Sequence, residues 1–221
     1  YYIFAELDSF GTVDRLVREF DVNSADDLED RFIFEPELME SYLDLDLTYL
    51  PQSSASALKD LLRVVYQSDK PVRVTPMSAL NIADLKNSHV IYVGYISALD
   101  KLMDFVFASS GLELGETYDE LFNIESGESY TSGAGIPSSE RGNYTDYGLF
   151  STFPGPGDNQ VMIVAGTRDE GLMHTAQALT NPVGVMALET RLPSVTGDDV
   201  PALEALYEVT GVDRTNLDAV L

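Results

Sequence analysis

The chain has 221 residues, no cysteine and a formal net charge of −24, because 37 acidic residues outnumber 13 Lys and Arg. The missing cysteines exclude disulfides, Cys-based zinc sites and thiol nucleophiles. A surface of this charge repels phosphate backbones, so we expect no direct binding of nucleic acid. No apolar run approaches the length of a membrane span, and the first ten residues resemble a strand rather than a signal peptide, so we expect a cytoplasmic protein with no membrane partner.

The first residues in chain order are predicted to form a strand followed by two helices. Residues 1–7 are rich in aromatic and β-favouring side chains, which indicates a strand. Thr12 is a plausible N-cap for a helix whose apolar residues recur at i, i+3, i+4 and i+7. Ser24 then opens a short acidic helix that Pro36 limits. The apolar stripe of the first helix consists of Val13, Leu16, Val17 and Phe20.

The next stretch alternates strand-like and helix-like patterns. Residues 45–50 read as a strand, the residues up to Tyr66 as a helix with an apolar stripe, and residues 71–75 as a second strand, which together predict a βαβ unit. Asn81 is expected to cap one helical turn. The continuous apolar run at residues 89–93 predicts a central strand buried on both faces.

The second half is predicted to repeat the order strand, turn, helix, with a long connection between the repeated elements. A helix begins near Ser97, and residues 111–145 read as a long flexible surface excursion. Residues 146–153 and 160–165 predict an antiparallel hairpin, with 161–165 fully buried. The remaining expectations are a helix from Asp169 to about residue 180, a strand at 183–189, and a last helix beginning at Asp198 with Leu203, Leu206 and Tyr207 facing inward.

These elements predict an α/β fold with a mixed, mostly parallel sheet covered by helices in three layers. The length of the chain allows one α/β domain over residues 1–221 or a two-lobed module. The first residue is Tyr1 rather than Met, so we expect a fragment of a longer protein.

Ligands of open, mostly parallel sheets bind beyond the carboxyl ends of the strands, where the N–H groups of helix N-termini face outward. Three predicted turns lie between an apolar strand and an amphipathic helix, and their glycines and hydroxyls suit close contact with a ligand. The same residues are also ordinary turn and capping residues. The candidate ligand-binding residues are Ser53, Ser54, Gly94, Tyr95, Ser97, Gly166, Thr167 and Arg168.

Arg168 is the most informative of these residues, because a cation at a helix N-terminus opposes the helix dipole and calls for a compensating anion. That anion is either a ligand carboxylate or a nearby acidic residue such as Asp169, Glu170 or one in a neighbouring loop. His89 and His174 have no companion at metal-ligand spacing. We therefore predict no metal site, no cofactor and no catalytic residue, since hydrolase, P-loop, metalloprotease and dinucleotide motifs are all absent.

Parts of the chain resemble a poorly characterised bacterial α/β domain associated with winged-helix transcriptional regulators. These parts are the Asp146–Gly148 segment, Gly155–Pro156, residues 161–167, and residues 90–94 with the helix after them. The layout is also loosely similar to two-lobed, type 2 periplasmic-binding-like effector modules. The resemblance implies a ligand-sensing or regulatory domain with a small-molecule ligand. One alternative is an enzyme acting on a small anionic substrate, with Arg168 as anion clamp and Asp169 or His174 as general acid or base. The other is a structural domain that forms a homodimer.

Overall fold

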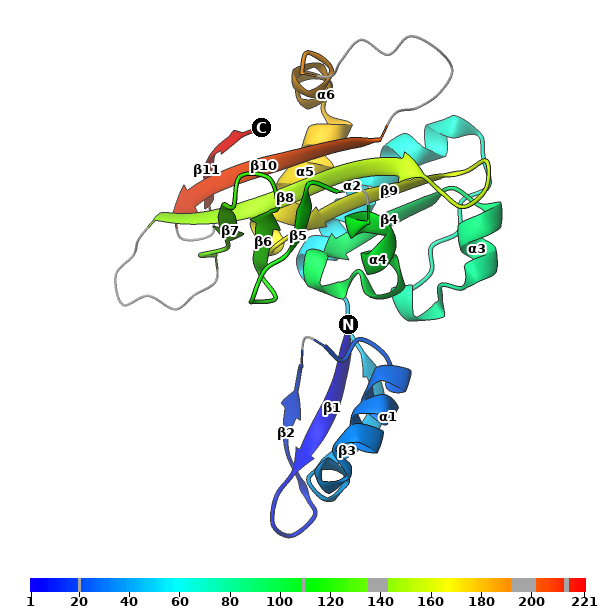
Figure 1. The fold of residues 1–221 in the computed structure, drawn as a ribbon, viewed down its shortest axis with the longest axis vertical. Coiled ribbons are helices and arrows are strands. Elements are labelled where there is room, and N and C mark those ends of the chain that lie inside the picture. Colours follow the sequence, from blue (N-terminus) through cyan, green and yellow to red (C-terminus); the bar gives the residue numbers. More distant parts are fainter. Residues whose placement is uncertain (20, 109, 135–142, 192–201, 213–214) are drawn as a thin grey trace. The chain divides into compact units, whose positions relative to one another are not determined.

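The computed structural model describes residues 1–221 except 20, 109, 135–142, 192–201 and 213–214. The chain divides into two compact units, Tyr1–Pro51 and Gln52–Leu221 (Figure 1). Each unit has hydrophobic clusters of its own. Within the described residues, no helix combines the length and apolar character that crossing a membrane requires.

The N-terminal unit is a three-stranded antiparallel sheet with one α-helix packed against it. Its strands are β1 (Tyr2–Leu7), β2 (Val13–Val17) and β3 (Tyr42–Thr48), in the order β2-β1-β3. The helix α1 (Ala25–Phe34) and a 3₁₀ turn (Pro36–Glu40) connect β2 to β3. Tyr2 and Phe4 of β1 pack with Val22 and Leu28 to form the core of the unit.

Three of the four expectations for this unit are confirmed and one is wrong. The strand expected at residues 45–50 is part of β3, which ends at Thr48. The strand β1 and the helix α1 are present, and Ser24 caps α1 by accepting a hydrogen bond from the N–H of Asp27 at 3.1 Å. The helix expected from Thr12 is instead the strand β2. The Asp8 carboxylate accepts hydrogen bonds from the N–H groups of Phe10 and Thr12, each at 2.9 Å, and this closes a hairpin turn in which Gly11 has a φ of 75°.

The C-terminal unit is built on a five-stranded sheet of order β11-β10-β8-β9-β4. The β4–β9 pair is parallel, and the β8–β9, β8–β10 and β10–β11 pairs are antiparallel. The fold is therefore α/β, but the expected three-layer arrangement around a mostly parallel sheet is wrong. The strands are β4 (Val90–Tyr95), β8 (Asn143–Pro154), β9 (Gln160–Gly166), β10 (Leu203–Val212) and β11 (Thr215–Val220).

Side chains alternate between the two faces of this sheet and feed two separate clusters. Leu149 and Ile163 belong to one cluster, while their chain neighbours Phe150 and Val164 belong to the other. The second cluster includes the helices α2 (Gln52–Val65), α5 (Asp169–Thr180) and α6 (Pro182–Glu189). The first includes residues of α3 (Ile82–Asn87), α4 (Met103–Phe107) and a small sheet of β5 (Leu112–Leu114), β6 (Glu120–Asn123) and β7 (Ser129–Thr131).

The expectation of two fully buried central strands holds for one of them except at Met162, which is half-buried. In β9, Val161, Ile163, Val164 and Ala165 are at most 1% exposed, and the strand lies between β8 and β4. In β4, Ile91 is 39% exposed because the strand forms one edge of the sheet. The prediction of a doubly covered β4 is therefore wrong.

Several local expectations for this unit are also wrong. Residues 71–75 form no strand, so the expected βαβ unit is absent. Residues 183–189 belong to the helix α6, and Leu203, Leu206 and Tyr207 lie on the strand β10 instead of a helix. The helix expected from Ser97 is broken into two 3₁₀ turns, Ile96–Ala98 and Asp100–Leu102, followed by α4.

Other local expectations are confirmed. The β8–β9 hairpin, the helix α5 and the Asn81 cap of α3 are present. The expected excursion at residues 111–145 contains the small sheet β5-β6-β7, with Leu112 and Leu121 buried. Residues 135–142 and the start of the expected last helix lie outside the described residues.

Candidate functional site

Two of the three turns selected from the sequence meet at one end of the sheet. β4 and β9 are parallel neighbours, with Tyr95 paired with Gly166, so the segments that follow both strands leave the sheet at the same edge. The Tyr95 hydroxyl donates a hydrogen bond to the carboxylate of Asp169, the first residue of α5. The Ser53 hydroxyl, in the first turn of α2, lies 3.4 Å from the Tyr95 hydroxyl and brings the third turn into the same site.

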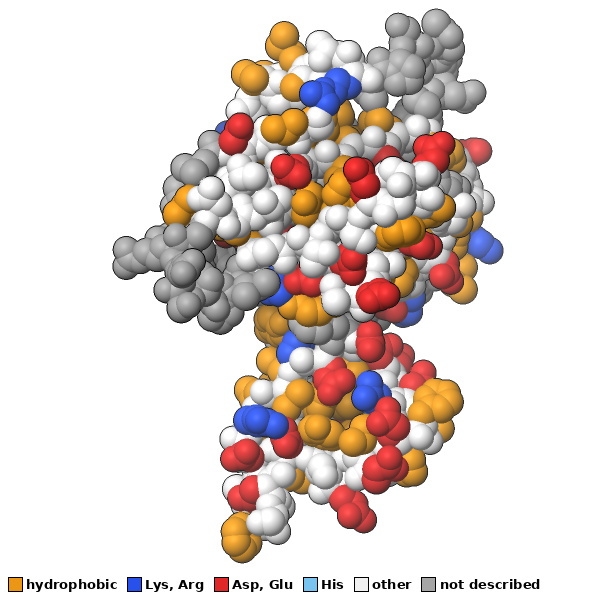
Figure 2. All heavy atoms as spheres, turned by 60° about the vertical axis from the view of Figure 1, so that its left-hand side comes forward, with side chains coloured by type: hydrophobic (Ala, Val, Ile, Leu, Met, Phe, Trp, Pro, Cys, Tyr) orange, Lys and Arg blue, Asp and Glu red, His pale blue; other side chains and the backbone are white. Residues whose placement is uncertain are grey.

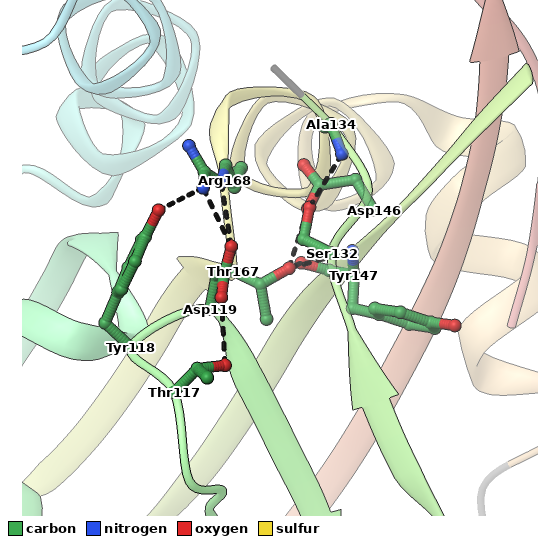
Figure 3. Close-up of polar contacts among 9 residues, drawn as sticks. All are labelled: Thr117, Tyr118, Asp119, Ser132, Ala134, Asp146, Tyr147, Thr167 and Arg168. Atoms are coloured by element: carbon green, nitrogen blue, oxygen red, sulfur yellow. Dashed lines mark hydrogen bonds and ion pairs between the residues drawn. The ribbon is translucent and has the colours of Figure 1, made fainter. Parts of the chain in front are cut away.

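Arg168 extends this site towards the loop before β6 (Figure 3). Its Nε and Nη2 donate to Oδ2 of Asp119 at 3.1 and 2.8 Å, and Nη2 also donates to the Tyr118 hydroxyl. The guanidinium carbon lies 5.0 Å from the centre of the Tyr118 ring, at cation–π distance. Thr117 donates to the other Asp119 oxygen at 3.0 Å. The compensating anion expected beside Arg168 is thus an acidic residue of a neighbouring loop.

This ion pair is partly shielded from water. The side chain of Arg168 is 28% exposed and that of Asp119 is 8% exposed. Burial acts to lower the pKa of Arg168, but the hydrogen bonds that Arg168 donates to Asp119 and the surrounding negative charge outweigh it, and the pKa is raised above its ordinary value. Arg168 therefore remains a fixed cation in a region dominated by carboxylates.

A buried carboxylate from the strand β8 caps the helix α5. The N-cap residue, Arg168, makes no side-chain capping bond itself. Asp146 of β8 has no exposed surface, and its Oδ2 accepts the N–H of Gly171 at 2.6 Å. Its Oδ1 accepts the hydroxyls of Thr167 at 2.6 Å and Ser132 at 2.7 Å (Figure 3). A negative charge at this end of a helix is favourable, since it complements the dipole and pairs an N–H that lacks an intrahelical partner.

Glycines allow α5 to approach the sheet closely enough for this cap. A Cβ on Gly171 would lie 2.0 Å from the carbonyl oxygen of Tyr147, and one on Gly148 would lie 2.4 Å from the carbonyl oxygen of Gly171. A Cβ on Gly166 would lie 2.2 Å from the backbone nitrogen of Leu172. Backbone atoms cannot move aside as a flexible side chain can, so these positions require glycine.

The structure gives several of the sequence-selected residues internal roles. The Thr167 hydroxyl donates to Asp146 and accepts the N–H of Tyr147, and Gly166 allows the close packing of α5. A Cβ on Gly94 would lie 2.7 Å from the Tyr92 hydroxyl.

Two other selected residues carry buried hydroxyls. Ser54 and Ser97 are 2% and 8% exposed, and within the described residues their Oγ atoms have no hydrogen-bond partner. No group of three potential metal-ligating side chains occurs in the part of the chain that the structure describes.

Sequence reasoning missed Tyr118, Asp119 and Asp146. Asp119 is 49 residues from Arg168 along the chain, so no local spacing connects them. Asp146 carried a detectable signal, because an acidic residue at the start of the apolar run that forms β8 requires a partner if it is buried.

The comparisons with known proteins returned no match to a family model, to a curated protein or to a solved structure.

Proposed function

We propose that the C-terminal unit is a ligand-sensing module that binds a small anionic molecule at the ends of β4 and β9, as the regulatory part of a larger protein. The observation that carries this proposal is the parallel pairing of Tyr95 with Gly166, which brings Tyr95, Arg168 and Asp169 to one edge of the sheet. Carboxyl ends of parallel strands are the usual location of ligands in sheets that contain them.

The ion pair of Arg168 with Asp119 supports an exchange mechanism. A ligand carboxylate or phosphate that replaces Asp119 on the guanidinium meets the same pair of N–H donors, because both anions accept paired hydrogen bonds from Arg. Release of Asp119 changes the loop that precedes β6, since the Asp119 carbonyl also accepts the N–H of Ser132 at 3.0 Å. Ligand binding at one residue is thus coupled to the position of a loop, which is what a sensor requires.

The rival proposal of an enzyme receives less support. Asp169 is engaged with Tyr95, and His174 packs edge-on against Tyr207 with ring centroids 5.2 Å apart. His174 lies six residues beyond Arg168, about 9 Å along a helix axis, so the two side chains do not serve one reacting atom. The rival proposal of a dimerising structural domain also receives less support. It gives no reason for the three turns to meet at one edge of the sheet.

Isothermal titration calorimetry of the full chain with succinate and with inorganic phosphate tests the proposal by measuring the affinity for each anion. We expect one of these anions to bind, and Arg168→Met to weaken the binding by about 1.5–3 kcal/mol, the scale of a charge-assisted hydrogen bond. Asp119→Asn should act in the opposite direction and strengthen binding, because it removes the internal competitor. Arg73→Met, at an exposed ion pair with Asp84, is the matched control and should change nothing.

The opposite signs of the two variants separate binding from folding. Both break the same ion pair and both are expected to lower stability, so a merely structural role gives no reason for affinity to rise in one of them. The proposal fails if neither anion binds to either the native chain or the Asp119→Asn variant, or if both variants weaken binding equally.

A further inference from the structure

The sheet of the N-terminal unit has one face that α1 covers and one face that no described element of the unit covers. Tyr2 and Phe4 of β1 contact α1 residues, so the alternating residues of β1 point to the opposite face. Directly paired residues of antiparallel strands share a face, and Ala5 is paired with both Leu16 and Leu43 while Ile3 is paired with Leu47. The open face consists of Ile3, Ala5, Leu7, Leu16, Leu43 and Leu47.

The composition of this open face is the reverse of what a solvated face requires. An antiparallel sheet with one free side normally alternates apolar residues on the core side with polar residues on the other. Here the five residues of these three pairs are all apolar. Ala5 at the centre has no exposed surface, and the apolar surface that reaches solvent belongs to Leu16, Leu43 and Leu47 on the outer strands, which are 54%, 44% and 40% exposed. A contiguous apolar patch of this kind on a small unit indicates an interaction surface.

The dimensions of the open face fit one helix. The patch spans two strand spacings, about 10 Å, and extends from Ile3 to Leu7, about 13 Å at the rise of a strand. A helix with its side chains is about 10–12 Å wide and covers this length with about nine residues.

The charge of the unit selects the chemistry of the partner. Residues 1–51 contain 14 acidic residues and three arginines, with no lysine or histidine. Asp14 and Asp46, both exposed, lie on the same outer strands β2 and β3 as the exposed leucines. Acidic side chains are scattered over the face shown in Figure 2, with few basic ones among them. Two copies of such a unit repel each other, whereas a cationic partner is attracted.

We infer that the open face binds a cationic amphipathic helix of a partner protein, with the apolar stripe of the helix on the leucines and its Lys and Arg residues against the surrounding acids. Such a helix completes the unit as a sheet covered on both sides. This binding mode lays an apolar helix face along an apolar surface and adds electrostatic attraction at the rim. The inference is independent of the anion site in the C-terminal unit.

The test uses the full chain and a fluorescent 14-residue helical peptide with Leu at helical spacing and Lys at all other positions. The matched peptide carries Glu in place of Lys. We expect fluorescence anisotropy to detect binding of the Lys peptide that weakens with added salt, and binding of the Glu peptide to be at least about tenfold weaker. The variant Leu16→Ser with Leu47→Ser should weaken binding of the Lys peptide about tenfold or more.

Ile33→Ser is the control, because Ile33 is 67% exposed in the same unit but lies on α1. This control should bind the Lys peptide like the native chain. If circular dichroism shows that the Leu16→Ser, Leu47→Ser double variant is unstable, the single variant Leu43→Gln replaces it and should show the same loss of peptide binding. Equal binding by the native chain and the leucine variants reveals general attraction to an acidic surface and overturns the inference. So does a concentration-dependent dimer that Leu16→Ser abolishes, or the absence of any binding of the Lys peptide at up to about 1 mM.

Discussion

Replacement of Asp146 by Asn tests the buried carboxylate that caps α5. The carboxylate accepts three hydrogen bonds, from the Thr167 and Ser132 hydroxyls and from the N–H of Gly171. The amide of Asn keeps the shape but has one acceptor oxygen and an NH2 donor in place of the other, so the groups that donate to that second position lose their acceptor. Loss of one charge-assisted bond costs about 1.5–3 kcal/mol, and loss of the negative charge at the helix N-terminus about 0.3–1 kcal/mol more.

We therefore expect Asp146→Asn to lower the free energy of unfolding by about 2–4 kcal/mol in urea denaturation at neutral pH, with the dependence on urea unchanged. Asp158→Asn is the matched control, since Asp158 is exposed at the tip of the β8–β9 hairpin, and it should stay within about 0.5 kcal/mol of the native chain. A loss below about 1 kcal/mol for Asp146→Asn would refute the reasoning, because it is no larger than that of an average neutral hydrogen bond.

Two further predictions concern the packing of α5 and its one histidine. Gly171→Ala should destabilise the C-terminal unit by about 1–3 kcal/mol or more in the same urea assay, because its Cβ would lie 2.0 Å from a backbone oxygen. Gly111→Ala, whose Cβ would meet nothing nearer than 3.9 Å, should cost much less, and equal losses would contradict the clash. Burial lowers the pKa of His174 below its usual 6.5, so its contribution to stability is present above about pH 6.5 and is lost as the pH falls. Thermal melts between pH 7.5 and 5.5 should show a shallower pH dependence for His174→Gln than for the native chain or for His89→Gln, and identical slopes in all three would contradict the assignment.

Local signals in the sequence predicted those elements that local chemistry determines. Ser24 and Asn81 were recognised as helix caps, and both accept the expected backbone hydrogen bond. The uninterrupted apolar run of β9 predicted a buried strand, since both of its faces meet hydrophobic clusters. The edge strand β4 has a similar run, and its exposure depends on the strand order, which periodicity does not encode.

Elements determined by long-range pairing escaped the sequence analysis. Leu203, Leu206 and Tyr207 are at helical spacing, but the chain forms β10, which pairs with β8, and buries the alternating residues Ala205, Tyr207 and Val209 instead. The strand β2 is a second case, because Val13, Leu16, Val17 and Phe20 are at helical spacing, but residues 13–17 pair with β1 and form a strand. Partners remote in the chain, such as Asp119 of Arg168, are brought together by the fold alone.

The cap supplied by Asp146 also narrows the mechanism proposed for the anion site. At many strand-to-helix turns the N–H groups of the helix bind the ligand anion directly. In this chain the N–H of Gly171 is already bonded to an internal carboxylate, and the negative charge of Asp146 repels a second anion at that end of α5. A ligand anion must therefore bind through the side chain of Arg168 and compete with Asp119. This competition makes affinity depend on the strength of the Arg168–Asp119 pair, which is why Asp119→Asn and Arg168→Met are expected to move it in opposite directions.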